Sequence, residues 1–152
     1  MKITNYLTRK QILIDLKSTE KRGLLEELVQ CLINEGQASA KHFEEMIVGL
    51  LEREELTSTG LGYGLALPHI KTNAVAKIQI VFGRSIRGIE FASLDGKPTK
   101  LFFLILSPPE MTNEYLKVIS SISALMKDAD QRQHLLGAQS AEEIFSFLSS
   151  TK

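Results

Sequence analysis

The sequence predicts one layered α/β domain over residues 1–152, with a mixed sheet of mostly five strands and helices on both of its faces. Three observations support this prediction. Strand-like and helix-like patterns alternate from end to end, without a repeat or a linker. Residues 101–106 are all apolar, as in a strand that is covered on both faces. The length of 152 residues suits one ordinary domain with a continuous core.

The N-terminal part is expected to form a strand followed by two helices. Residues 11–16 have a strand pattern, and Ser18 or Thr19 is placed to cap a helix that ends at Gly36. Ser39 opens a second helix, which should end within residues 57–60 because threonine, serine and glycine favour local hydrogen bonds or positive φ angles. Its apolar residues recur at the spacing of one stripe facing a core: Phe43, Met46, Ile47, Leu50 and Leu51.

The remaining elements continue the alternation. Residues 65–67 form a short apolar stretch, and residues 75–82, 89–94 and 99–106 have strand patterns, with a turn at residues 95–96. After two prolines a long helix follows, and a short helix ends before Gly137. The long helix has apolar residues on one face: Tyr115, Ile119, Ile122 and Met126. A last helix begins at Ser140, where a glutamate three residues later completes a capping box.

Composition excludes several classes of function. The 18 basic and 18 acidic residues cancel, so no global field draws the protein to nucleic acid or to an anionic membrane. No apolar run is long enough to span a bilayer, and residues 1–16 build no signal peptide, so a cytoplasmic protein is expected. Cys31 is expected to be a buried small hydrophobe. Three scattered histidines lack the spacing of metal ligands, so neither a metal nor another cofactor is expected.

Residues 57–70 carry the candidate chemistry. Gly60, Gly62 and Gly64 alternate, so the backbone can approach a ligand closely, and unhindered N–H groups can cradle an anion. The pattern is not a dinucleotide fingerprint, which needs a glycine where Leu65 stands. It is not a P-loop either, because no Gly-Lys-Ser/Thr follows. A glycine-rich turn with a purely structural role remains the alternative.

His69 directly follows Pro68 at the end of a short apolar stretch. Proline fixes the direction of the chain, so the imidazole is held on a stiff support at a strand end, where ligands gather in α/β sheets. A satisfied structural histidine is the alternative. His42 and His134 lie in polar surroundings and are expected to be solvated.

Residues 59–69 read Thr-Gly-Leu-Gly-Tyr-Gly-Leu-Ala-Leu-Pro-His, which resembles the active-site signature of the fructose/mannitol-type enzyme IIA domains. These domains belong to the phosphoenolpyruvate-dependent sugar phosphotransferase system (PTS). The likeness extends to residues 51–54, 94–98, 104–108 and 138–143, and a free-standing domain of this length looks most like the nitrogen-regulatory IIA proteins. The resemblance implies that the phosphocarrier HPr hands a phosphoryl group to Nε2 of His69. A IIB partner then takes it onward, or the phosphorylation state is itself the signal.

The resemblance also implies roles for residues around His69. Arg53 matches the family's arginine beside the phosphohistidine, and a guanidinium can hold phosphate oxygens in bidentate fashion. A solvated arginine on a helix face is the alternative. Thr59 either donates its hydroxyl to the phosphate or only terminates the helix. The candidates for an apolar patch that docks HPr are Leu61, Tyr63 and Ile70.

One position departs from the family pattern. Many members carry a second histidine near the start of the helix after the central strand, and here Tyr115 stands there. A tyrosine donates one hydrogen bond but does not titrate near neutrality. Three functions therefore stay open: a regulatory phosphocarrier, an interaction module that binds partners without phosphoryl transfer, and the IIA component of a sugar permease. A hydrolase has little support, because the sequence has no Gly-x-Ser-x-Gly motif and no carboxylate visibly paired with His69.

Overall fold

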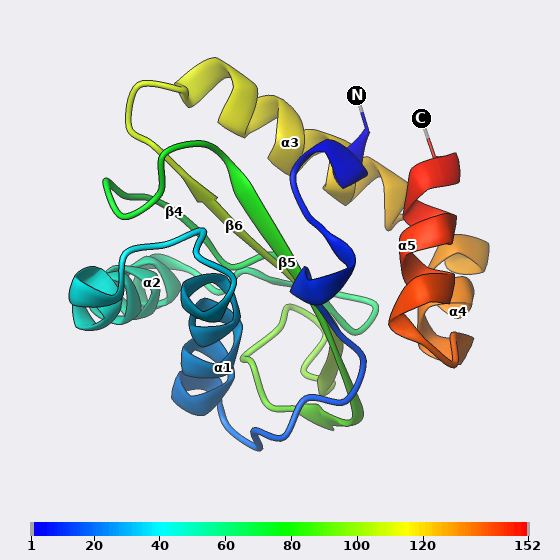
Figure 1. Ribbon diagram of the computed structural model, residues 1–152. Helices are drawn as coiled ribbons and strands as arrows, with labels where there is room; N and C mark the ends of the chain where they lie inside the picture. Colours follow the sequence, from blue (N-terminus) through cyan, green and yellow to red (C-terminus); the bar gives the residue numbers. More distant parts are fainter. Residues whose placement is uncertain (1, 152) are drawn as a thin grey trace.

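The computed structural model describes residues 2–151 and places one mixed sheet between two layers of helices (Figure 1). One face of the sheet is covered by α1 (Lys21–Asn34) and α2 (Phe43–Leu56). The other face is covered by α3 (Thr112–Leu125), α4 (Ala129–Gly137) and α5 (Ala141–Ser150). The predicted α/β class, with a mixed sheet and helices on both faces, is confirmed.

The sheet has six strands in the order β1-β5-β6-β3-β2, and β4 also pairs with β6. β5 and β6 are antiparallel, whereas β1 runs parallel to β5, and β3 and β4 run parallel to β6. The strands are β1 (Ile12–Leu13), β2 (Gly60–Gly62), β3 (Leu65–Ala66), β4 (His69–Lys71), β5 (Gln79–Ile89) and β6 (Thr99–Ser107). Three short 3-10 segments complete the described elements: η1 (Ile3–Asn5), η2 (Arg9–Gln11) and η3 (Ala40–His42).

Several predicted strands have different bounds. The first covers only two residues, because Gln11 belongs to η2 and uses its side chain to donate to the carbonyl of Ile80. The strand expected at 75–82 instead covers 79–89. The separate strand expected at 89–94 does not form: Ile89 ends β5, and Ala92 has a φ of +50° and leaves the extended region. The sheet gains strands at 60–62 and 69–71. Because Pro68 has no N–H, the chain pairs with β6 in two pieces, before and after it.

The helix bounds were predicted better at their ends than at their starts. Neither Ser18 nor Thr19 caps α1; Glu20 does, accepting a hydrogen bond from the Gly23 amide at 2.8 Å. Ser39 precedes the short η3 rather than α2. The end of α2 at Leu56 is confirmed, and so is the cap of α5, where the Ser140 hydroxyl accepts from the Glu143 amide. None of the helices within residues 2–151 is long and apolar enough to cross a membrane.

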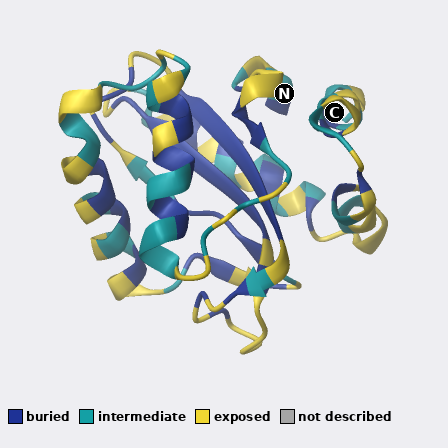
Figure 2. Cartoon of the chain, turned by 60° about the horizontal axis from the view of Figure 1, so that its bottom comes forward, coloured by how far each residue is buried: buried dark blue, intermediate teal, exposed yellow. Residues whose placement is uncertain are grey.

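The core is divided by the sheet into two clusters, and β6 contributes to both. Leu101, Phe103 and Ile105 pack in the cluster beneath α3, α4 and α5, while the residues between them pack beneath α1 and α2. Figure 2 shows the consequence: the strands are buried, and the exposed residues lie on the outer sides of the helices and in the loops. The prediction of a central strand covered on both faces is confirmed. This rigid strand also supports β4 and therefore His69.

Candidate functional site

His69 begins β4, where it pairs in register with Ile105 of β6, and its side chain is half-buried. Its Nδ1 lies 2.6 Å from the carbonyl oxygen of Leu67. Because a carbonyl oxygen can only accept, we assign the proton to Nδ1 from this contact. The other ring nitrogen, Nε2, then carries the free lone pair. The backbone thus holds the imidazole in the tautomer that leaves Nε2 without a proton.

The surroundings of His69 favour its neutral form. Burial lowers the pKa of His69 below its ordinary value of 6.5, and the nearby charge of Arg53 lowers it as well. The hydrogen bond to Leu67 and the charge of Glu54 act in the opposite direction. The pKa stays lowered on balance, so the ring is neutral at neutral pH, as a nitrogen nucleophile must be.

Arg53 lies in the last turn of α2 and is partly exposed. Its Nη1 donates to the carbonyl oxygen of Thr57 at 2.7 Å, which ties the guanidinium to the end of the helix. Its positive charge acts on the pKa of both His69 and Tyr115, so the structure brings these three side chains together. The guanidinium keeps further N–H donors that are free to meet an anion beside His69.

Tyr115 lies in the first turn of α3 and is only 6% exposed. Its ring meets the His69 imidazole edge to face, with 5.9 Å between the ring centroids and 62° between the planes. Burial raises the pKa of Tyr115 to about 12, although the charge of Arg53 opposes this, so the phenol stays protonated. Tyr115 therefore lies beside His69 as the resemblance implied.

Lys71 is a charged neighbour of Tyr115 that the sequence did not single out. It follows His69 by two positions in β4, so the two side chains leave the same side of the strand. Its Nζ lies 6.0 Å from the centroid of the Tyr115 ring and donates to the hydroxyl of Thr112 at 2.8 Å. The i, i+2 spacing after His69 was the only signal in the sequence. Lys71 adds a second positive charge on the side of Tyr115.

The glycine-rich segment is a β-hairpin. Gly62 of β2 pairs with Leu65 of β3, and the two residues between them, Tyr63 and Gly64, have φ angles of +59° and +75°, as in a type I′ turn. The Tyr63 amide donates to the Asp95 carboxylate at 3.1 Å. The Asp95 carboxylate is therefore already bound to an amide of this loop. These contacts favour the structural interpretation of Gly60, Gly62 and Gly64, and their role in phosphate binding stays a prediction.

Thr59 is 2% exposed and turns toward Glu54. Its backbone amide donates to the two oxygens of the Glu54 carboxylate at 3.1 and 3.2 Å, and its hydroxyl donates to the same carboxylate. Glu54 also forms a salt bridge with Lys21 at 3.2 Å. The Thr59 hydroxyl proton is thus engaged with Glu54, which supports the helix-terminating interpretation. Glu54 lies within residues 51–54, which resemble the family, but nothing in that stretch distinguished it from Glu52 and Glu55, which are exposed residues of the same type.

The predicted docking residues differ in exposure. Tyr63 is 67% exposed and Leu61 is 36% exposed, while Ile70 is half-buried. The sequence reasoning missed two other exposed leucines near this segment: Leu56 ends α2, and Leu94 donates its amide to the Gly60 carbonyl at 3.3 Å. The segment around β2 thus presents several apolar side chains to solvent. Docking of a partner there stays a prediction.

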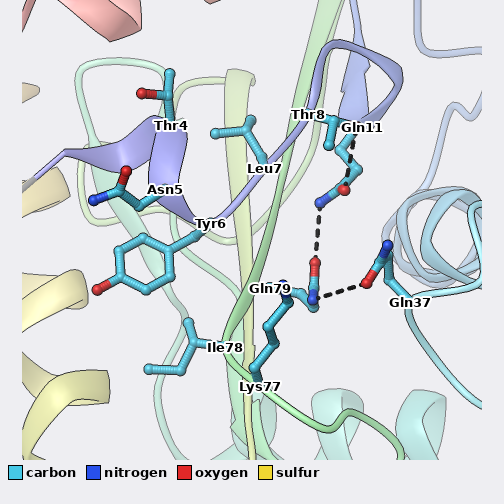
Figure 3. Close-up of a pocket in the computed structure, with 10 residues that line it drawn as sticks. All are labelled: Thr4, Asn5, Tyr6, Leu7, Thr8, Gln11, Gln37, Lys77, Ile78 and Gln79. Carbon is cyan, nitrogen blue, oxygen red and sulfur yellow. Dashed lines mark hydrogen bonds between the residues drawn. The ribbon is translucent and has the colours of Figure 1, made fainter.

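A separate hollow of about 130 Å³ lies beneath the N-terminal segment and shares no residue with the site around His69 (Figure 3). Three glutamine amides line it and bond to one another: Gln11 donates to Gln79 at 3.3 Å, and Gln79 donates to Gln37 at 3.2 Å. Its lining holds no nucleophile paired with a base. The bond between Gln11 and Gln79 therefore links η2 to β5, and the hollow has no part in the site around His69.

Metal ligands and thiols give no further candidate in the described part of the chain. Within residues 2–151, no group of three or more His, Cys, Asp or Glu side chains is placed to hold a metal ion. Cys31 is buried, as predicted, and burial raises the pKa of its thiol to about 11. A thiol with such a pKa is almost entirely protonated at neutral pH and is a poor nucleophile.

Comparison with known proteins identifies the family. Residues 5–151 match the family described as "Phosphoenolpyruvate-dependent sugar phosphotransferase system, EIIA 2". The chain belongs to this EIIA family. The resemblance inferred from residues 59–69 is confirmed, and the fold around His69 is an EIIA fold.

Individual relatives include both regulatory and sugar-specific EIIA proteins. The nitrogen regulatory protein of Bradyrhizobium diazoefficiens is 34% identical over 148 residues, which cover 97% of this chain and 95% of that protein. The fructose-specific EIIABC component of Bacillus subtilis is 37% identical over 97% of this chain, but the chain spans only 23% of that protein. The crystal structure of the nitrogen regulatory protein IIA-Ntr from Neisseria meningitidis matches with a TM-score of 0.87 at 33% identity, covering 96% of this chain and 98% of that one.

Proposed function

We propose that this EIIA protein is a phosphocarrier that accepts a phosphoryl group from an HPr-type protein on Nε2 of His69, in a regulatory role like that of the nitrogen-regulatory relatives. One observation carries the proposal. The bond from Nδ1 to the Leu67 carbonyl leaves Nε2 with a free lone pair, in a ring whose pKa is lowered by burial. No cofactor enters the reaction. A cytoplasmic location, where HPr-type carriers act, is part of the proposal.

The transfer needs little covalent work from the protein. The Nε2 lone pair attacks the phosphorus of the donor's phosphohistidine, the phosphorus–nitrogen bond of the donor breaks, and its electron pair returns to the donor's ring. His69 keeps its Nδ1 proton throughout, so the new phosphohistidine ring carries a positive charge that the Leu67 carbonyl faces. Positive charge near the equatorial phosphate oxygens stabilises the transition state. Arg53, whose charge already acts on the pKa of His69, would supply that charge from α2. Lys71, whose Nζ lies 6.0 Å from the centroid of the Tyr115 ring, would add to it from β4.

The partners follow from the same chemistry. An HPr-type carrier delivers the phosphoryl group, and either a IIB component or a regulated target protein receives it or senses it. The docking surface consists of Leu61, Tyr63 and Ile70, with Leu56 and Leu94 extending it. A partner bound on this surface would exclude water from the transfer.

Two other functions have a specific observation in their favour. The fructose-specific relative from B. subtilis supports a role as the IIA component of a sugar permease. Tyr115, in the place of a second histidine, supports an interaction module that binds partners without phosphoryl transfer. We favour the carrier because His69 keeps a free Nε2 and charged neighbours, which binding alone does not require.

The test is direct phosphorylation. The protein is incubated with phosphoenolpyruvate, enzyme I and HPr, and the intact mass is recorded before and after acid treatment. We expect one acid-labile phosphoryl group on the wild type and on His42→Ala, whose half-buried histidine pairs with Glu45 at the opposite end of α2 from Arg53, and none on His69→Ala. An unlabelled wild type would overturn the carrier function. If a IIB component of a sugar permease then removes the label, the permease role is supported over the regulatory one.

A further inference from the structure

The side chain of Glu54 forms the first link in a chain of hydrogen bonds that ends at His69. We infer that Glu54 is a positioning residue: its buried carboxylate holds Thr59, Thr59 holds the Leu67 backbone, and the Leu67 carbonyl holds the His69 ring with Nε2 free. The kinetic consequence of this inference rests on the proposed phosphocarrier function. The orientation itself does not, and it can be measured in the free protein.

Each link of the chain is short and directional. The Thr59 amide donates to both Glu54 oxygens at 3.1 and 3.2 Å, and the Thr59 hydroxyl donates to one of them. The Thr59 carbonyl accepts from the Leu67 amide at 3.0 Å. The Leu67 carbonyl accepts from Nδ1 of His69 at 2.6 Å. Since Pro68 contributes no N–H, no donor between Leu67 and His69 competes with the imidazole for that carbonyl.

Glu54 stands where a carboxylate is unfavourable for folding alone. It lies in the last turn of α2, where the partial negative charge of the helix end repels an anion. It is also buried, and its ion pair with Lys21 at 3.2 Å recovers only part of the desolvation cost. Lys21 in turn stacks over the ring of Phe91 at 4.4 Å. Exposed Glu52 and Glu55 on the same helix avoid this cost. A role in holding Thr59 therefore explains the buried position of Glu54 better than a contribution to the free energy of folding does.

The negative charge of Glu54 also complements the reaction. When Nε2 takes a phosphoryl group, positive charge develops on the ring, and Glu54 favours that charge; it already acts to raise the pKa of His69. The other groups around the ring are Arg53 from α2 and Tyr115 from α3, and Lys71 of β4 lies beside Tyr115, with its Nζ 6.0 Å from the centroid of that ring. Arg53 disfavours and Glu54 favours positive charge on the ring, both before and after transfer. Glu54 therefore offsets part of the cost that Arg53 and burial impose on the cationic ring formed by transfer.

The test compares Glu54→Gln with Glu55→Gln, an exposed neighbour on the same helix, after both variants are shown to fold by circular dichroism. Long-range ¹H–¹⁵N spectra of ¹⁵N-histidine-labelled protein report which ring nitrogen of His69 carries the proton, without any phosphoryl donor. We expect the Nδ1–H tautomer in the wild type and in Glu55→Gln, and a mixture of both tautomers in Glu54→Gln. The turnover rate from phosphorylated HPr should fall roughly 10-fold in Glu54→Gln, by analogy with the outer partners that orient metal-ligating histidines, while the KM for HPr stays constant.

The outcomes separate this inference from the proposed function. If Glu54→Gln keeps the wild-type tautomer and the wild-type rate, the positioning role is overturned while the carrier function stands. If the wild type accepts no phosphoryl group, the carrier function fails, and the tautomer spectra still decide the positioning role. If Glu54→Gln does not fold, Glu54→Asp replaces it, because the shorter side chain draws the carboxylate away from both the amide and the hydroxyl of Thr59. An unchanged tautomer in Glu54→Asp would then overturn the inference.

Discussion

Replacing Arg53 by alanine is the sharpest test of how this site handles phosphate charge. The guanidinium makes one bond within the chain, to the Thr57 carbonyl at 2.7 Å, at a partly exposed helix end. Loss of that bond should lower the free energy of unfolding by about 1 kcal/mol or less, so the fold survives. Loss of one preorganised charge-stabilising donor costs about 2–4 kcal/mol in the transition state. Because Arg53 is partly exposed and Lys71 adds a second charge, we expect the lower half of that range.

A loss of about 2–3 kcal/mol corresponds to a rate that is about 30- to 150-fold lower. The assay is single-turnover transfer from phosphorylated HPr, followed by intact mass. Arg87→Ala is the control. Arg87 is an exposed arginine near the end of β5, whereas Ile105, the neighbour of His69, pairs with Ile80 near the start of that strand. Arg53→Lys, which keeps the charge but not the bidentate geometry, should fall between the wild type and the alanine variant. Equal rates for Arg53→Ala and Arg87→Ala would refute the placement of Arg53 against the phosphate.

Three further predictions concern His69, Tyr115 and the core. Burial lowers the pKa of His69 in the folded protein below its unfolded value of 6.5. The neutral ring therefore contributes to the free energy of unfolding above pH 6.5, and this contribution is lost as pH falls through the lower folded pKa. NMR titration of His69 should give a pKa below 6.5, and denaturation from about pH 7.5 to about pH 5 should show the falling stability. Tyr115→His, which adds a titratable ring at 5.9 Å, should change the hydrolysis rate of the phosphohistidine, and an unchanged rate would place Tyr115 outside the site. Gly83→Ala should lower the free energy of unfolding by about 1–3 kcal/mol, because the added Cβ would lie 2.9 Å from methyl carbons of Leu16 and Leu28. Urea titration measures this change, and an unaltered midpoint would mean that these leucines move aside.

The sequence predicted the elements whose signal is continuous. The apolar stripe of α2 and the unbroken strand β6 both appear as expected, because burial on one face or on two imposes a long regular pattern. The short strands β2 and β4 were missed. β2 consists of two glycines and a leucine, and β4 begins at the site histidine, so neither has the alternation that marks a strand. Each is defined by its partner instead: β2 pairs with β3, and β4 pairs with β6, which follows much later in the chain.

In the candidate site, too, contiguous residues could be predicted from the sequence, and residues that act through distant contacts could not. His69 could be selected from the sequence because the glycines, Pro68 and the histidine are contiguous. Glu54 could not, since its importance depends on a bond to Thr59 and on burial, and nothing in the helix pattern separates it from Glu55. Thr59 was assigned two possible roles, and the choice between them required seeing where its hydroxyl points. Residues that act through tertiary contacts are thus the part of a site that sequence patterns leave out.

Tyr115 is best understood from what already orients His69. A second histidine at this place would add a side chain able to direct the ring or to titrate with it. Here the ring is directed by the Leu67 carbonyl, a backbone group that no substitution at Tyr115 removes. Positive charge comes from Arg53 and Lys71, and burial keeps the pKa of Tyr115 near 12, so the phenol adds packing and no charge. With tyrosine instead of histidine, His69 has no second imidazole beside it that could titrate, but its Nε2 keeps the same orientation. This favours the proposed carrier over a module without phosphoryl transfer. Of these two rings, we expect only His69 to make the transfer rate depend on pH.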